Sequence, residues 1–103
     1  MSAQIFGLDY DGTFTADPDL WRQFISAAQA RGHTVVCVTA RRTPPDYSRE
    51  PRMPDSVSIV CAGQVWKKHA AAKAGYPVNV WIDDIPGLIE PTRVLDVGGS
   101  ANG

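Results

Sequence analysis

The sequence feature that most restricts the fold of this chain is a set of short, mostly apolar runs, in which apolar and polar residues do not alternate strictly. They form most of the predicted strands at residues 4–9, 34–38, 57–61 and 78–82, and the first run itself is Ile5-Phe6-Gly7-Leu8. A strand that reads as a nearly continuous apolar run is typical of a parallel sheet covered on both faces. Runs of this length favour strands over helices. A further run at 94–97 predicts a fifth, short strand at an edge of the sheet.

Helical segments are predicted between these strands, as a parallel sheet requires. Residues 17–31 begin with Asp-Pro-Asp, which supplies a side-chain cap, a proline at the first helical position and an acid in the first turn. A second, alanine-rich helix is predicted from about Gln64 to Ala74, where Gly75 follows. Residues 41–54 contain four prolines and four arginines and are predicted to be a loop.

Length and composition restrict the class of protein. A chain of 103 residues fits one domain, and a net charge of −1 argues against a generic nucleic-acid binder, although not against a local basic groove. Cys37 and Cys61 lie inside apolar runs, which favours two reduced, buried thiols over a disulfide or a reactive site. The sequence shows no signal peptide and no apolar run near the roughly 20 residues that span a bilayer. We therefore expect a cytoplasmic protein that has no membrane partner.

Two aspartates follow the first apolar run at once, in the sequence Asp9-Tyr10-Asp11-Gly12-Thr13. Side chains two residues apart on an extended segment point to the same side, so Asp9 and Asp11 should repel each other. A bound divalent cation relieves this repulsion, and oxygen ligands suit Mg²⁺. Gly12 would allow a sharp turn and the close approach of an anion.

An acidic turn or a calcium loop are the alternatives for this motif. A calcium loop of the EF-hand type that begins at Asp9 would require glycine at position 14 and glutamate at position 20. The chain has Phe14 and Leu20 there, which breaks the pattern.

Polar residues also follow the other predicted strands. Thr39 ends the second, Lys67 and Lys68 lie on the second predicted helix, and Asp83-Asp84 follows the fourth. Ligands of open parallel sheets bind beyond the carboxyl ends of the strands, so these residues are expected to form one site. Taken singly, each also fits a plain structural role, as a capping threonine, solvated lysines or a solvated turn.

Together, and in this order, Asp9-x-Asp11-Gly-Thr, Thr39, a lysine and Asp83-Asp84 resemble the four motifs of the haloacid dehalogenase (HAD) superfamily, over residues 4 to about 90. The resemblance implies a Mg²⁺-dependent phosphatase that hydrolyses a phosphomonoester through an aspartyl-phosphate. It makes Asp9 the nucleophile and Asp11 the general acid and base. Family dehalogenases lack the second aspartate, so Asp11 favours phosphoryl chemistry.

The resemblance also implies roles for the remaining polar residues. The Thr39 hydroxyl would hold a phosphoryl oxygen, and either Lys67 or Lys68 would offset negative charge. The sequence does not choose between the lysines, because one residue turns a side chain by about 100° around the helix axis. The expected metal ligands are Asp9, Asp11, Asp83 and Asp84, with Asp83 as a direct ligand and Asp84 holding the metal's waters or the lysine. The expected substrate-binding residues are Gly12, Thr13, Ala40, Arg41 and Arg42.

The predicted fold class is α/β. We expect a single-domain, Rossmann-like parallel sheet of about five strands with helices on both faces, over residues 1–97, and a flexible tail at 98–103. Only residues 14–16 separate the first motif from the first helix, and only a loop and one strand precede the lysines. Neither position at which HAD enzymes insert a cap has room for one, so no cap domain is expected.

A capless site is open to bulk water. This favours a bulky phosphorylated substrate, such as a nucleotide, a nucleic-acid end or a phosphoprotein, or a lid contributed by another subunit. The loop at 41–54 is the expected specificity element, because Arg41 and Arg42 suit bidentate phosphate binding and Tyr47 suits stacking on a base. A solvated surface loop is the alternative.

Two other functions compete with an active phosphatase. The chain would also fit a catalytically idle HAD-like module that binds phosphorylated partners or acts as a scaffold, although every motif position is filled. A phospho-accepting receiver domain is disfavoured. Receivers place the acidic pair near the first strand and the lysine last, whereas Lys67 and Lys68 precede Asp83-Asp84 here.

Overall fold

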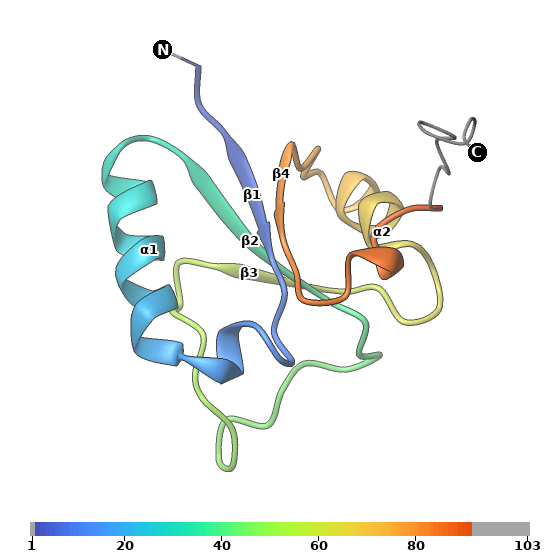
Figure 1. The fold of residues 1–103 in the computed structure, drawn as a ribbon, viewed down its shortest axis with the longest axis horizontal. Coiled ribbons are helices and arrows are strands. Elements are labelled where there is room, and N and C mark those ends of the chain that lie inside the picture. The colour runs from blue at the N-terminus through green and yellow to red at the C-terminus, as the bar shows by residue number, and fades with distance from the viewer. Residues whose placement is uncertain (1, 92–103) are drawn as a thin grey trace, which may run out of the picture.

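The computed structural model describes residues 2–91, which form one α/β domain built on a four-stranded parallel sheet. The order of the strands is β3-β2-β1-β4, as Figure 1 shows. Their bounds are β1 Ile5–Leu8, β2 Thr34–Thr39, β3 Ser58–Cys61 and β4 Val80–Ile82. The predicted α/β parallel sheet is confirmed. The expected fifth strand at 94–97 and the expected tail at 98–103 lie outside the described residues.

The turn η1 (Phe14–Ala16, 3₁₀) and the helix α1 (Pro18–Ala30) connect β1 to β2, and the helix α2 (Lys67–Lys73) connects β3 to β4. A second 3₁₀ turn, η2 (Pro86–Leu88), follows β4. The predicted cap of α1 is present, since its capping aspartate accepts a hydrogen bond from the Leu20 amide at 3.2 Å. Neither α-helix of residues 2–91 has the length and hydrophobicity needed to cross a bilayer.

The second helix is shorter than the sequence suggests and starts at Lys67 instead of Gln64. Gly63 has a positive φ of +61°, which turns the chain after β3. Trp66 is extended, with ψ of 136°, so it precedes the helix as its N-cap residue. This late start decides which lysine side chain turns toward the sheet.

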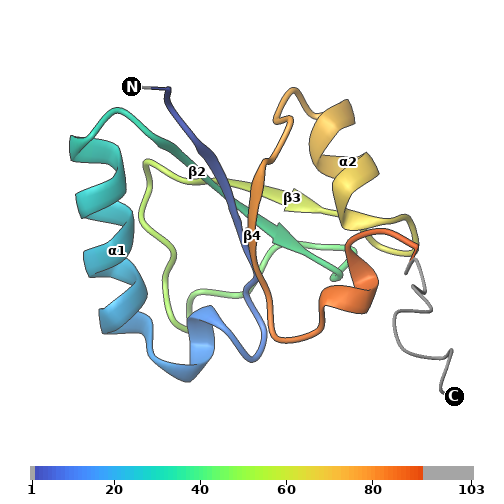
Figure 2. The same ribbon diagram turned by 45° about the horizontal axis from the view of Figure 1, so that its top comes forward.

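Alternate residues of β2 pack into two separate hydrophobic clusters. Val35 and Cys37 belong to the cluster that contains Ile25 and Ala28 of α1. The other cluster combines Val36 and Val38 with Ala71 of α2. Figure 2 shows the sheet running between the two helices. Because both sides of β2 are buried, its sequence is apolar without alternation. Both cysteines are free, as predicted, although Cys61 is only partly buried.

The long segment between β2 and β3 has no helix or strand, as predicted, but it folds back onto the core. Met53 and Val57 are buried there, and Tyr47 packs against the same cluster as α1. The guanidinium of Arg52 lies 4.9 Å from the centre of the Tyr47 ring. The half-buried Tyr47 ring therefore contacts core residues and a cation, and its stacking on a base stays a prediction.

Candidate active site

The carboxyl ends of β1 and β4 lie side by side and bring three carboxylates together. Leu8 pairs with Ile82 across the two strands, and the Asp9 amide donates to the Ile82 carbonyl at 3.0 Å. Carboxylate oxygens of Asp9, Asp83 and Asp84 all lie within 4.8 Å of one another. We call these three residues the acidic triad. The structure thus brings together aspartates from the first and last motifs.

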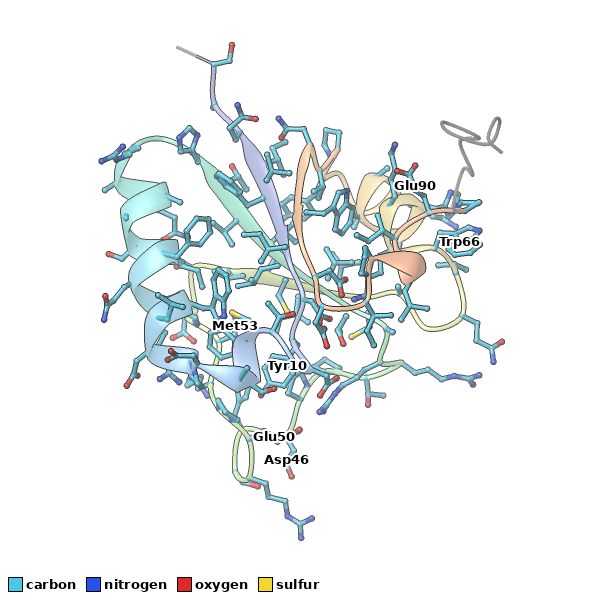
Figure 3. The ribbon with its side chains drawn as sticks, viewed as in Figure 1. Tyr10, Asp46, Glu50, Met53, Trp66 and Glu90 are labelled. Atoms are coloured by element: carbon cyan, nitrogen blue, oxygen red, sulfur yellow. The ribbon has the colours of Figure 1, made fainter. Side chains whose placement is uncertain are left out.

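Lys67 supplies a positive charge to the acidic triad. Its Nζ donates to Asp9 Oδ1 at 2.8 Å and to Asp83 Oδ2 at 2.6 Å, and its side chain is only 2% exposed. Lys68 instead forms an exposed ion pair with Glu90, at 3.1 Å. Glu90 is labelled in Figure 3, beside α2. Of the two lysines, Lys67 is therefore the one that reaches the site.

The Thr13 hydroxyl lies between two carboxylates of the acidic triad, those of Asp9 and Asp84. Its Oγ1 lies 3.1 Å from Asp9 Oδ2 and 3.2 Å from Asp84 Oδ1, and it accepts a hydrogen bond from the Asp84 amide at 3.2 Å. A hydroxyl has one proton to donate, so it serves one of these carboxylates at a time. Thr13, expected as a substrate-binding residue, is buried in this structure and orients the carboxylates.

Burial and close neighbours change the proton affinities of these groups. Burial raises the pKa of Asp9 to about 6, against the Lys67 hydrogen bond, which lowers it. Hydrogen bonding to Asp9 holds the pKa of Asp84 below its ordinary value. Burial lowers the pKa of Lys67, but its hydrogen bonds to Asp83 and Asp9 outweigh this and the net shift is upward. Lys67 therefore stays positively charged at neutral pH.

The donor atoms of the acidic triad suit a hard divalent cation. Three carboxylates face a single ammonium group, so negative charge is in excess. Oxygen ligands are preferred by Mg²⁺ and Ca²⁺, whereas softer metals favour nitrogen and sulfur. The residues present can therefore hold such an ion.

Gly12 leaves room for the acidic triad. Its φ is +82°, and a methyl group on its Cα would lie 2.4 Å from Asp84 Oδ2. We expect Gly12→Ala to displace the Asp84 carboxylate and to weaken Mg²⁺ binding about tenfold or more, as loss of a metal-orienting contact does elsewhere. Isothermal titration of the metal-free chain with Mg²⁺ measures this.

Gly75→Ala is the matched control for this substitution. Gly75 also has a positive φ, of +98°, but no heavy atom lies within 4 Å of the added methyl group. Both variants should lose about 1–2 kcal/mol of stability through backbone strain, and the contact with Asp84 adds to this loss only in Gly12→Ala. Only Gly12→Ala should lose metal affinity, and equal affinities in the two variants would contradict the role given to Gly12.

Asp11 does not join the acidic triad, although the sequence suggested it as a metal ligand. Its exposed carboxylate accepts two hydrogen bonds from Arg41, from Nε at 2.8 Å and from Nη2 at 2.7 Å. The physical reason is local. The strand β1 ends at Leu8 and residues 10–13 form a turn, so the same-side rule for extended chains does not apply to Asp9 and Asp11.

Glu50 is a site residue that no sequence pattern marked. Arg41 donates to Glu50 Oε2 at 2.9 Å and to Oε1 at 2.5 Å, so one guanidinium bridges Asp11 and Glu50. The hydrogen bonds to Asp11 and to Glu50 raise the pKa of Arg41 above its ordinary value. The Arg41 hydrogen bond lowers the pKa of Glu50.

The remaining expected residues lie around this centre. Thr39 is buried at the end of β2, and its Oγ1 accepts a hydrogen bond from the Arg41 amide at 3.2 Å. Ala40 and Lys67 line a cavity of about 280 Å³, with the exposed Trp66 on its wall. Trp66 is labelled in Figure 3. Arg42 is exposed next to Arg41, and no described contact ties it to the site.

The site thus combines the acidic triad, Lys67 and Thr13 with the Asp11–Arg41–Glu50 chain of ion pairs. Comparisons of this chain with models of protein families, with curated proteins and with solved structures found no match. The residues of the site and their resemblance to the HAD motifs are therefore the basis for inferring a function.

Proposed function

We propose that this protein is a capless phosphatase of the HAD superfamily that hydrolyses a phosphomonoester with Mg²⁺. One observation carries the proposal. The buried Lys67 ammonium lies between Asp9 and Asp83, and Asp84 completes the acidic triad around them. A buried ammonium beside the proposed nucleophile would offset the negative charge of the phosphoryl group as the carboxylate attacks.

Asp9 is the proposed nucleophile. Its carboxylate attacks phosphorus, the bond to the leaving oxygen breaks, and an aspartyl-phosphate forms. Asp11 protonates the leaving oxygen and then takes a proton from the water that hydrolyses the intermediate. Lys67 and Thr13 orient the Asp9 carboxylate. The acidic triad would hold Mg²⁺, which when bound would offset negative charge on the phosphoryl oxygens.

The substrate is proposed to be a nucleotide, a nucleic-acid end or a phosphoprotein. Between Asp11 and α1 the structure has only the turn η1, and the segment between β2 and β3 has no helix or strand. An open site of this kind suits a large substrate, or a lid from another subunit. The proposed phosphate-binding residues are Thr39, Ala40, Arg41 and Arg42. The proposal also includes a cytoplasmic location. It further includes a five-stranded, Rossmann-like sheet with helices on both faces.

Metal removal tests the mechanism. A panel of phosphomonoesters should be hydrolysed in the presence of Mg²⁺, and excess EDTA should abolish hydrolysis because the acidic triad alone repels a phosphate dianion. Adding Mg²⁺ back in excess should restore the rate. Phosphate release measured by a colorimetric assay reports each step, and full activity in excess EDTA would rule the mechanism out.

A catalytically idle, phosphate-binding module is the second candidate. It is favoured by one observation, namely that Asp11 is held by Arg41 outside the acidic triad. Mg²⁺ binding without hydrolysis of any substrate in the panel would support it.

A further inference from the structure

The Arg41 guanidinium is held along two of its edges. A guanidinium has five N–H donors, and four of them have partners here. Nε and Nη2 donate to Asp11, whereas Nη1 and Nη2 donate to Glu50. The Asp11 side chain is 55% exposed and the Glu50 side chain 27%. Asp11 is thus the partner that water and solutes reach more readily.

The edge of the Arg41 guanidinium that faces Glu50 is held in place by further contacts. Glu50 Oε2 also accepts a hydrogen bond from the Asp46 amide at 2.8 Å, which ties the carboxylate to its own loop. The face of the guanidinium lies 5.2 Å from the centre of the Tyr10 ring. Tyr10 is fully buried, and its hydroxyl donates to the Pro51 carbonyl at 2.6 Å. Figure 3 labels Tyr10, Asp46 and Glu50, which cluster where this loop meets the turn after β1.

We propose that Glu50 is a positioning residue, which holds Arg41 so that the edge now bound to Asp11 is presented to the substrate phosphoryl group. A phosphate dianion accepts the same two parallel N–H bonds as a carboxylate. Binding of substrate would then exchange Asp11 for phosphate on that edge and free Asp11 for the leaving group. This inference rests on the proposed function and adds to it a residue in the loop between β2 and β3.

The direction in which Glu50→Gln changes phosphate affinity distinguishes a positioning role from an effect of charge alone. Glu50 carries a negative charge near a site for an anion, so its charge alone disfavours phosphate. If charge were all that mattered, Glu50→Gln would tighten phosphate binding. If Glu50 positions Arg41, the same substitution loosens the guanidinium and weakens binding.

The experiment measures binding of inorganic phosphate to the full chain in the presence of Mg²⁺, by isothermal titration. We expect Glu50→Gln to weaken binding about tenfold, the size of a lost hydrogen bond to a charged group. Mg²⁺ affinity should be unchanged, because Glu50 does not contact the acidic triad in the described structure. Glu90→Gln, which alters an exposed glutamate paired with Lys68, is the matched control and should leave both affinities unchanged.

Combining the substitution with a change at Arg41 shows whether Glu50 acts through Arg41. In an Arg41→Gln chain, adding Glu50→Gln should weaken phosphate binding no further. Should Glu50→Gln fail to fold, Arg41→Lys replaces it, since lysine keeps the charge but cannot bridge both carboxylates; about tenfold weaker binding is again expected.

Unchanged or tighter phosphate binding in Glu50→Gln overturns the inference, as does a wild-type affinity in Arg41→Lys. The same holds if the wild-type chain binds no phosphate. A chain that binds phosphate with the expected Glu50 dependence but hydrolyses no substrate would overturn the proposed catalysis and support the positioning role.

Discussion

Replacing Asp9 by asparagine should abolish phosphatase turnover, with a loss of more than about 10⁴-fold in kcat. The amide that replaces the carboxylate is almost the same size but is not nucleophilic, so no aspartyl-phosphate forms. The buried side chain would still lie between Lys67 and Thr13, which contact Asp9 in the wild-type chain. The measurement is single-substrate kinetics with Mg²⁺, on the best substrate of the phosphomonoester panel.

Substitutions of two other aspartates serve as comparisons for the effect of Asp9→Asn on turnover. Asp11→Asn should cost about 10²- to 10⁴-fold, because it removes the proton transfer but keeps the nucleophile. Asp19→Asn changes a side chain that is 87% exposed and pairs with Arg22 at the surface, so it should leave turnover unchanged. If Asp9→Asn retained a tenth of the wild-type rate, Asp9 would not be the nucleophile.

Lys67→Met should lower the free energy of unfolding of the metal-free chain by about 3–5 kcal/mol. The side chains of Asp9 and Asp83 are 6% and 2% exposed, and Lys67 is the cation that both contact. Methionine fills a similar volume but leaves two neighbouring carboxylates without a counter-charge. Urea unfolding in EDTA, followed by circular dichroism, measures the loss.

Lys68→Met is the matched control, since the two lysines are adjacent and lie on the same helix. Lys68 pairs with Glu90 at the surface, where such pairs contribute about 0–1 kcal/mol. Excess Mg²⁺ should recover part of the stability lost in Lys67→Met, because the ion replaces the missing positive charge. Equal destabilisation in the two variants would show that the buried ion pair does not stabilise the fold.

Four of the five expected strands, the first helix and the convergence of the first and last motifs could be predicted from the sequence and are present in the described residues. Continuous apolar runs are a local signal of buried parallel strands, and Asp17 with Pro18 is a local signal of a helix start. Neighbouring parallel strands end at the same edge of their sheet. For that reason Asp9 and Asp83 meet although 74 positions separate them.

Three features of the site could be seen only in the folded chain: the lysine that enters the site, the direction of Asp11 and the participation of Glu50. The choice of Lys67 depends on where α2 begins, because adjacent helical side chains differ by about 100° in direction. Asp11 is turned away by an ion pair with Arg41, 30 positions along the chain, and Glu50 joins them through a loop without regular structure. Contacts of this kind leave no periodic trace in a sequence, because they are set by the packing of the loop against the core.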